Sequence, residues 1–342
     1  MAIIPMRVML DHAAENNYGI GAFNVNNMEQ IQAIMQAANE TQSAVIVQAS
    51  RGARNYSQDN YLRHLMLAAA ELNPDIPIAM HLDHGNAPSA CISAVKMGFT
   101  SVMMDGSLEE DAKTPASWEY NVRVTKEVVD FAHARGVTVE AELGCLGGIE
   151  DGQGAGLSEA EAQDHLTDPE EAGEFVEATG CDALAVAIGT SHGAYKFKKK
   201  PTGQVLRMDV IREIHSRMPN CHMVMHGSSS VPQELIAIIN EYGGQMPETY
   251  GVPVEDIQEG IKHGVRKINV DTDNRLAITG AIRKVLSLSP EKFDPRDYLK
   301  PARQAMAEVV AARMVSFGSA GHAGGVAKMG LEDMKSYYMA QA

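Results

Sequence analysis

Short, β-branched apolar runs alternate eight times with longer amphipathic segments along this chain of 342 residues. We expect strands at 19–25, 44–50, 76–84, 101–107, 137–144, 183–190, 221–229 and 265–273. We expect helices at 28–40, 58–71, 86–97, 115–135, 168–179, 207–217, 232–242 and 273–287. This alternation predicts a parallel sheet, because each helix carries the chain back to the end where the next strand begins.

Eight such units are the number that closes a (β/α)₈ TIM barrel, and the chain is long enough for one that carries insertions. An open, doubly wound sheet is the alternative, but the GxGxxG turn with which such sheets usually begin is missing. No interdomain linker is evident, so we expect residues 1–342 to form a single barrel domain with C-terminal helices from about residue 295. Irregular structure is expected at 145–158, 193–206, 243–260 and 318–325.

The composition excludes several kinds of partner. The net charge is −15, whereas nucleic acids and anionic membranes are bound by basic surfaces. The four cysteines are widely spaced and form no CxxC pair, which favours a reducing compartment over a disulfide framework or a structural zinc cage. We find no secretory signal and no apolar run long enough to span a bilayer. The sequence therefore predicts a cytoplasmic protein that binds neither nucleic acid nor a membrane.

Polar side chains stand at the same end of every expected strand. In a TIM barrel the active site lies at the C-terminal ends of the strands, where the loops between strand and helix meet. In chain order these ends carry Asn24, Ser50, Asp83 with His84, Asp105, Glu142, His192, His226, and Asn269 with Asp271. The pattern predicts a cup of polar side chains above an apolar barrel.

Three histidines at separate strand ends, His84, His192 and His226, are able to converge on one point. Three neutral imidazoles with one open position form the ligand set of a catalytic zinc site. A single histidine is more often a core or surface residue, but three at matching strand ends favour a metal. His81 has the opposite strand parity to His84, so we expect it to point the other way and to play a structural or supporting role.

Carboxylates flank the expected metal. Asp83 lies on the opposite side of a regular strand from His84, and it reaches a substrate only if the chain turns, which Gly85 would permit. We favour general acid–base catalysis for Asp83 over orientation of a ligand imidazole. Glu142 is expected to offer the metal an alternative position. Together with Glu140 on the same strand face, it either binds a second cation or satisfies buried polar groups.

Neighbouring strand ends also carry groups that suit a phosphate. The motif "HGSSSVP" offers Gly227 and Ser229 just ahead of a helix, and Thr272 follows the next strand. The motif "SHGAYK" adds Gly193 and Lys196. Backbone N–H groups and hydroxyls bind phosphate well, and barrels commonly bind it after strands seven and eight. A phosphorylated substrate is therefore predicted.

With these residues placed, the chain resembles the class II, metal-dependent fructose-1,6-bisphosphate aldolases over essentially its whole length. The motifs that carry the resemblance are "GAFNVNN", "IPIAMHLDHG", "SVMMDGS", "VEAELGCLGG", "GTSHGAYK", "HGSSSVP" and "KINVDTDNRLA". The resemblance implies reversible cleavage of fructose 1,6-bisphosphate to dihydroxyacetone phosphate and glyceraldehyde 3-phosphate, through an enediolate that Zn²⁺ stabilises. It also implies a homo-oligomer, either a dimer or a tetramer, and leaves open a second divalent or a monovalent cation.

The resemblance also implies roles for individual residues. The zinc ligands are His84, His192 and His226, with Glu142 at an alternative metal position and Asp105 close by. Asp83 handles the proton of the C4 hydroxyl. The residues that line the dihydroxyacetone-phosphate half are Asn24, Ser50, Gly193, Lys196, Gly227, Ser229, Asn269, Asp271 and Thr272. Arg275, from a neighbouring subunit, meets the far phosphate, and Asp294 and Arg296 help to distinguish fructose from tagatose.

One departure from the family pattern affects the second proton transfer. The better-known branch has paired acids in the glycine-rich loop, whereas here Ile149 precedes Glu150. Glu150 and His192 are therefore both candidates for this proton transfer.

Other functions also remain open at this stage. Lys267 shares a strand face with Asn269 and Asp271, so an aldolase that forms an imine with lysine is a rival. A tagatose-1,6-bisphosphate aldolase or another ketose-bisphosphate aldolase would use the same metal set. A metal-dependent hydrolase would not need the phosphate-binding residues, and a protein that only binds a phosphosugar would not need three ligand histidines.

Overall fold

The computed structural model describes residues 3–144, 166–190, 193, 197 and 199–341. Within this part of the chain, eight parallel strands close into a barrel in chain order, and β1 is hydrogen-bonded to both β2 and β8. The strands are β1 (Ile20–Asn24), β2 (Val45–Ser50), β3 (Ile78–Gly85), β4 (Ser101–Met104), β5 (Thr138–Leu143), β6 (Ala183–Val186), β7 (His222–Met225) and β8 (Val265–Val270). The predicted (β/α)₈ TIM barrel is confirmed.

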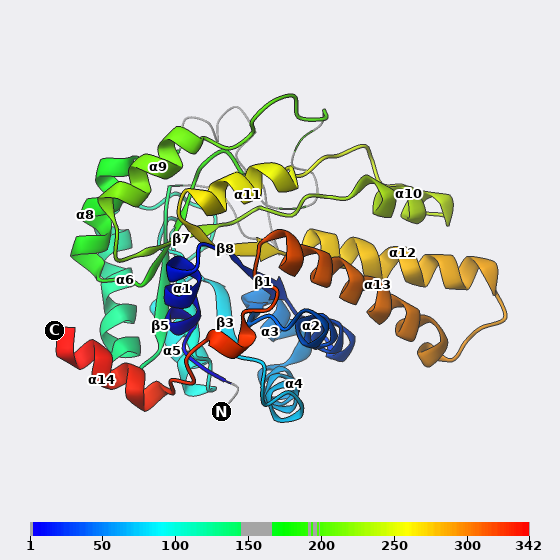
Figure 1. Cartoon of the computed structure of the whole chain (residues 1–342), viewed down its shortest axis with the longest axis horizontal. Helices are drawn as coiled ribbons and strands as arrows, with labels where there is room; N and C mark the ends of the chain where they lie inside the picture. Colours follow the sequence, from blue (N-terminus) through cyan, green and yellow to red (C-terminus); the bar gives the residue numbers. More distant parts are fainter. Residues whose placement is uncertain (1–2, 145–165, 191–192, 194–196, 198, 342) are drawn as a thin grey trace.

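Helices surround the strands (Figure 1). Between and after the strands lie α2 (Met28–Thr41), α3 (Arg51–Ser57), α4 (Asp59–Leu72), α5 (Pro88–Lys96), α6 (Trp118–His133), α8 (Pro169–Thr179), α9 (Met208–Arg217), α10 (Gln233–Glu241), α11 (Val254–Lys262) and α12 (Thr272–Leu288). The chain starts with α1 (Met6–Glu15) and ends with α13 (Pro295–Ser316), the 3₁₀ helix η1 (Ala323–Gly325) and α14 (Leu331–Gln341). Each helix that the sequence predicts is present, with ends within about three residues of the expected ones.

The sequence pattern misses three helices and overestimates the length of several strands. Helix α3 follows β2 directly because the Ser50 hydroxyl accepts a hydrogen bond from the backbone N–H of Ala53 at 3.1 Å, and its seven residues are too few to show a period. Helices α1 and α11 were also not expected. Strands β6 and β7 end four residues early, because Gly189 and Gly227, with φ of +100° and +61°, turn the chain out of the ladder.

The barrel interior has an apolar lower layer. Small and medium side chains from all around the sheet fill it, namely Ile20, Ala22, Ile46, Ala79, Met103, Ala183, Ala185 and Val224. The opposite faces of the same strands pack against the helices in a second and larger apolar cluster. The filled lower layer leaves the upper part of the interior, toward the C-terminal ends of the strands, for the polar groups of the candidate site.

Two long helices form an arm that projects from the barrel. In Figure 1, α12 runs outward from the end of β8, and α13 returns alongside it toward α2. With 17 residues in α12 and a rise of about 1.5 Å per residue, the tip of the arm lies roughly 25 Å from the end of β8. No helix in the described part of the chain combines the length and the apolar character that a membrane crossing requires.

A buried carboxylate ties the N-terminal helix to the lower part of the barrel. Asp182 is 0% exposed and accepts hydrogen bonds from Arg7 at 2.8 Å, from His133 at 2.9 Å and from the backbone N–H of Val139 at 2.7 Å. Burial alone raises the pKa of Asp182, but the hydrogen bond from His133 and the charges of His133 and Arg7 outweigh it, so the pKa is lowered. The carboxylate therefore contributes stability above about pH 4, and this contribution is lost as the pH falls through the lower folded-state pKa.

We expect Asp182→Asn to lower the free energy of unfolding by about 3 kcal/mol at pH 7, because Arg7 and His133 lose a buried anion. Urea denaturation followed by circular dichroism measures this loss. Asp209→Asn is the control, because Asp209 and Arg207 form an ion pair in which both side chains are about half exposed, and such pairs add little stability. An unchanged denaturation midpoint for Asp182→Asn would show that Asp182 does not anchor the helix.

Candidate active site

The polar residues predicted at the strand ends do gather at the C-terminal mouth of the barrel. Asn24 and Ser50 end β1 and β2, Asp83 and His84 lie near the end of β3, and Glu142 near the end of β5. Asp105, His226 and Asp271 each follow the last residue of a strand, and Asn269 is the penultimate residue of β8. All of these residues are at most 9% exposed, so their contacts with one another are little screened by water.

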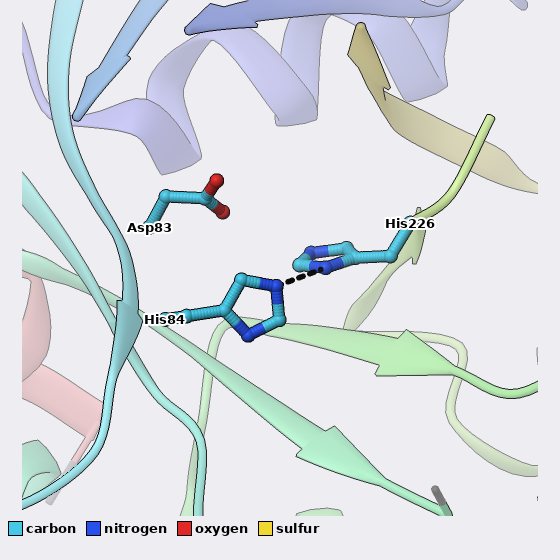
Figure 2. A group of neighbouring side chains, drawn as sticks. All are labelled: Asp83, His84 and His226. Carbon is cyan, nitrogen blue, oxygen red and sulfur yellow. Dashed lines mark hydrogen bonds between the residues drawn. The ribbon is translucent and has the colours of Figure 1, made fainter. Parts of the chain in front are cut away.

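A local irregularity in β3 brings Asp83 and His84 to the same side. His84 has a φ of +49°, and the pairing of β3 with β4 shifts register between Leu82 and Gly85. Figure 2 shows both side chains directed toward the space that faces His226. The turn therefore lies at His84 itself, not at Gly85 as expected. Gly85 is needed for close packing instead, because a Cβ there would lie 2.6 Å from the Cys91 sulfur.

Two imidazoles face each other across the mouth of the barrel. The Nδ1 atom of His226 lies 3.0 Å from the Nε2 atom of His84 (Figure 2). The far nitrogen of each ring is held by a carboxylate: His84 Nδ1 lies 2.9 Å from Asp105, and His226 Nε2 lies 2.8 Å from Glu140. Because carboxylates accept hydrogen bonds, both far nitrogens carry protons. The two near nitrogens form an N···N hydrogen bond with each other, and a bound cation would take the place of the proton that they share.

The charges around the two rings favour a shared cation. Burial lowers the pKa of His84, but the hydrogen bond to Asp105 and the charges of Asp83, Asp105 and Glu142 outweigh it, so the pKa is raised. Burial and the positive charges of His84 and Lys267 lower the pKa of His226. The pair thus holds one proton between two nitrogens, and a divalent cation would satisfy the same two lone pairs.

The surrounding donors fit a metal. Two groups have ligand atoms within 4.8 Å of one another, Asp83 with His84 and His226, and His84 with Asp105 and Glu142. The Oε2 atom of Glu142 is buried and has no hydrogen-bond partner among the described residues. Burial and the charge of Asp105 raise the pKa of Glu142, so this carboxylate also gains from a nearby cation. Imidazole nitrogens and carboxylate oxygens are the ligands of a catalytic zinc.

Three side-chain amides hold the carboxylate of Asp83. Asn24 and Gln48 donate to its Oδ2 atom at 3.0 and 3.1 Å, and Asn269 donates to its Oδ1 atom at 3.2 Å. Burial raises the pKa of Asp83, but the positive charges of His84 and Lys267 and the hydrogen bond from Asn24 bring it down to about 2. Asp83 is therefore held in one orientation, with a pKa well below neutral pH, as the predicted base requires.

A second polar layer lies directly beneath the mouth. Glu140 and Lys267 are 0% exposed and form an ion pair at 2.9 Å. His81 was expected to point the other way, but it lies inside the barrel, 2.7 Å from Ser101 and 3.3 Å from Glu140. The parity argument failed because His84, the reference residue, is the one that departs from strand geometry. Glu140 thus satisfies buried polar groups, one of the two roles foreseen for it.

The expected phosphate-binding residues lie around the ends of β7 and β8. Gly227 has a φ of +61°, and the hydroxyl of Ser229 accepts a hydrogen bond from the backbone N–H of Asp271 at 3.2 Å. Thr272 is the first residue of α12. The carboxylate of Asp273 accepts hydrogen bonds from the backbone N–H groups of Ser230 and Val231 and so fixes the loop that follows β7.

Arg275 lies at the mouth of its own chain. Its guanidinium contacts Asp271 at 2.6 Å, and it lines a pocket of about 410 Å³ together with Asn26, Asn27, Gln30, Gly52 and Tyr56. The resemblance implied that Arg275 serves a neighbouring subunit. In this structure Arg275 lines that pocket in its own chain, and its role across a subunit interface stays a prediction.

Other predicted site residues are not brought together with these. Asp294 caps the start of α13 at the tip of the arm, and Arg296 pairs with it while remaining 89% exposed. Gly193 is described, with a φ of +82°. His192, Lys196 and Glu150 lie outside the described residues, so the third metal ligand and the second proton donor stay predictions.

Sequence reasoning missed Gln48, which donates both to Asp83 and to the side-chain oxygen of Asn24 at 2.6 Å. A signal was present, because Gln48 lies two residues before Ser50 and shares its face of the strand. A buried glutamine in an apolar run on the predicted interior face is a candidate site residue in its own right.

Comparison with known proteins agrees with this geometry. Residues 4–322 match the family model described as class-II fructose-bisphosphate aldolase. The fructose-bisphosphate aldolase of Nostoc sp. strain PCC 7120 is 65% identical, with 99% of this chain and 96% of that protein aligned. The class 2 enzyme of Synechocystis sp. strain PCC 6803 is 63% identical over the same shares of each chain. Among solved structures, the YdjI aldolase of Escherichia coli K12 covers 94% of this chain and 99% of its own, with a TM-score of 0.73 and 29% identity.

Proposed function

Because this chain belongs to the class II fructose-bisphosphate aldolase family, we propose that it cleaves fructose 1,6-bisphosphate reversibly to dihydroxyacetone phosphate and glyceraldehyde 3-phosphate. The observation that carries the proposal is the pair of carboxylate-held imidazoles beside an ionised, amide-held Asp83. Cytoplasmic glycolysis or gluconeogenesis, or the Calvin cycle, is the setting that such an activity serves. A tagatose-1,6-bisphosphate aldolase is the alternative within the family.

We propose zinc as the metal, held by His84 and His226 and, from the family pattern, by His192. When bound, the metal supplies a Lewis acid that stabilises the negative charge left on the dihydroxyacetone-phosphate half after cleavage. Glu142 and Asp105 offer the alternative metal position that the resemblance implied, and their group with His84 supports it. A further monovalent cation stays a prediction from the resemblance.

Asp83 performs the first proton transfer. Its carboxylate takes the proton from the C4 hydroxyl, the bond between C3 and C4 breaks, and C4 leaves as the aldehyde carbon of glyceraldehyde 3-phosphate. The amides of Asn24, Gln48 and Asn269 hold the carboxylate in one orientation, so little reorganisation is needed at the moment of transfer. Glu150 or His192 then returns a proton to C3, which releases dihydroxyacetone phosphate.

The loops after β7 and β8 suit the phosphate of the dihydroxyacetone half. Backbone N–H groups near Gly227, the hydroxyls of Ser229 and Thr272, and the start of α12 all lie at this corner of the mouth, and the N-terminus of a helix favours an anion. Gly193 and Lys196 complete this set by the family pattern. Ser50 also lines the dihydroxyacetone half by the family pattern, and Arg275 is proposed to meet the phosphate of the aldehyde half from a neighbouring subunit.

The rival imine mechanism has less support. An imine requires an exposed, neutral amine, whereas Lys267 is 0% exposed and bound both to Glu140 and to Asn269. A substrate carbonyl would have to enter the layer beneath the metal to reach it.

We expect fructose 1,6-bisphosphate to be cleaved at least ~10-fold more efficiently than the tagatose epimer in a coupled assay, because a hydrogen-bonded site discriminates hydroxyl geometry. EDTA should abolish this activity, and added zinc should restore it. Cleavage that resists EDTA, together with covalent trapping of Lys267 by borohydride in the presence of substrate, would overturn the metal mechanism.

Removal of the proposed base should separate chemistry from metal binding. We expect Asp83→Ala to keep its zinc and to lower kcat by roughly 10³-fold, within the range typical of lost general base catalysis. Metal analysis and steady-state kinetics measure the two effects. Asp130→Ala, which removes a largely exposed carboxylate on α6, is the control with normal activity. Loss of zinc from Asp83→Ala would assign the residue to the metal site instead.

We also propose a homo-oligomer in which the arm of one copy serves the active site of another. Asp294 and Arg296 lie roughly 25 Å from their own barrel mouth by the length of α12, so they are able to act on substrate specificity only in a neighbouring copy. Exposed apolar side chains near the tip, Leu288 at 63% and Phe293 at 90%, support an interface there. The same arrangement accounts for a dimer or a tetramer.

Mixed oligomers test this arrangement. We expect Asp83→Ala and Arg296→Ala to be weakly active alone and to regain about a quarter of wild-type activity after subunit exchange, because in a dimer half the molecules are hybrids with one complete site of two. Differently tagged subunits and co-purification verify the exchange. Verified hybrids without regained activity would show that Arg296 does not act across the interface.

A further inference from the structure

We infer that Lys267 is a positioning residue that orients both a metal ligand, His226, and the catalytic base, Asp83, through two separate hydrogen-bond chains. The inference rests on the proposed function and adds to it a residue with a role other than imine formation.

Lys267 occupies a central place beneath the mouth of the barrel. It lies in β8, two residues before Asn269, and therefore on the same interior face. Its Nζ atom lies 2.9 Å from Oε2 and 3.2 Å from Oε1 of Glu140, and 2.8 Å from Oδ1 of Asn269. An ammonium group donates hydrogen bonds and accepts none, so Lys267 is the donor in its hydrogen bonds to Oε1 of Glu140 and Oδ1 of Asn269, while its contact with Oε2 is an ion pair.

The first chain runs through Glu140 to His226. Glu140 accepts from Nε2 of His226 at 2.8 Å, which fixes the proton on that nitrogen and leaves Nδ1 facing His84. Lys267 forms an ion pair with Glu140 at 2.9 Å in a fully buried position, where an unpaired carboxylate is strongly disfavoured. His81 is the other close partner of Glu140, with its Nε2 atom 3.3 Å from Oε2.

The second chain runs through Asn269 to Asp83. The amide of Asn269 has one accepting end and one donating end. Since Lys267 only donates, it holds the oxygen of Asn269 toward itself, and the amide nitrogen must then face Asp83, to which it donates at 3.2 Å. Without Lys267 the amide is free to rotate and to present its oxygen to the carboxylate, which would repel it.

Three full-length proteins test the two chains: wild type, Glu140→Gln, and the double variant Lys267→Met with Glu140→Gln. The double variant avoids an unpaired buried charge, so the loss of Lys267 is measured in a neutral pair that is able to fold. Zinc affinity is measured by chelator competition without substrate, and kcat is measured per bound zinc at saturating metal.

We expect Glu140→Gln to weaken zinc binding 10- to 100-fold, the usual effect of losing a partner of a metal ligand, and to regain most of its turnover when saturated with zinc. We expect the double variant to bind zinc about as weakly as Glu140→Gln and yet to turn over at least ~10-fold more slowly per bound zinc, because Asp83 has lost its orientation. A role in folding alone would lower the folded fraction and leave turnover per bound zinc equal to that of Glu140→Gln.

Equal turnover per bound zinc in the two variants would overturn the second chain, and wild-type zinc affinity in Glu140→Gln would overturn the first. In the wild-type protein, ¹⁵N spectra of the histidine rings should also show a proton on Nε2 of His226, and a proton on Nδ1 instead would contradict the first chain without any variant. If the wild type binds zinc but cleaves no ketose bisphosphate, the proposed function fails, whereas the zinc affinities still decide the role of Glu140.

Discussion

The contact between His84 and His226 is the constraint on which the rest of the site depends. Two imidazole nitrogens lie 3.0 Å apart while a carboxylate holds the far side of each ring. Such an arrangement directs two nitrogens and the surrounding carboxylates at one point, which a shared proton occupies in this structure and a metal cation would occupy in its place. A cation at this point would also attract the neighbouring carboxylates of Asp83 and Glu142. Their burial is then explained, because neither would be an isolated buried charge.

The barrel tolerates this concentration of charge because the side chains that stabilise the fold are different from those that form the site. The lower interior is filled with apolar side chains, and the outer faces of the strands pack against the helices, so the fold does not depend on the polar mouth. Between these regions lies a layer in which Lys267 balances Glu140. Burying this ion pair costs desolvation energy that apolar side chains in the same place would not cost. The ion pair is retained, we infer, because it orients the side chains of the site above it.

The strands, most helices and the position of the site follow from patterns that a sequence carries locally. Apolar periodicity predicts the eight units, and strand-end residues such as Asn24 and Glu142 lie where the (β/α)₈ rule places them. The left-handed residue His84 is different, because its conformation coincides with a register shift between β3 and β4 and no local pattern in the sequence reports it. The error for His81 follows from this one residue. The distant location of Asp294 and Arg296 depends likewise on the direction of α12, which neighbouring helices determine.

The side chains of the site are oriented by residues from distant parts of the chain. Asp83 is adjacent to His84 in the chain, yet the groups that orient Asp83 come from β1, β2 and β8, and those that orient His84 and His226 come from the β4–α6 loop and β5. Each reactive group is thus fixed by elements far away in sequence, and closure of the barrel is required before either is oriented. Lys267 contacts both sets, so the final strand, which pairs with the first to close the barrel, also links the proposed base to the proposed metal ligands. Pairing of β8 with β1 therefore both closes the barrel and completes the set of residues that orient the site.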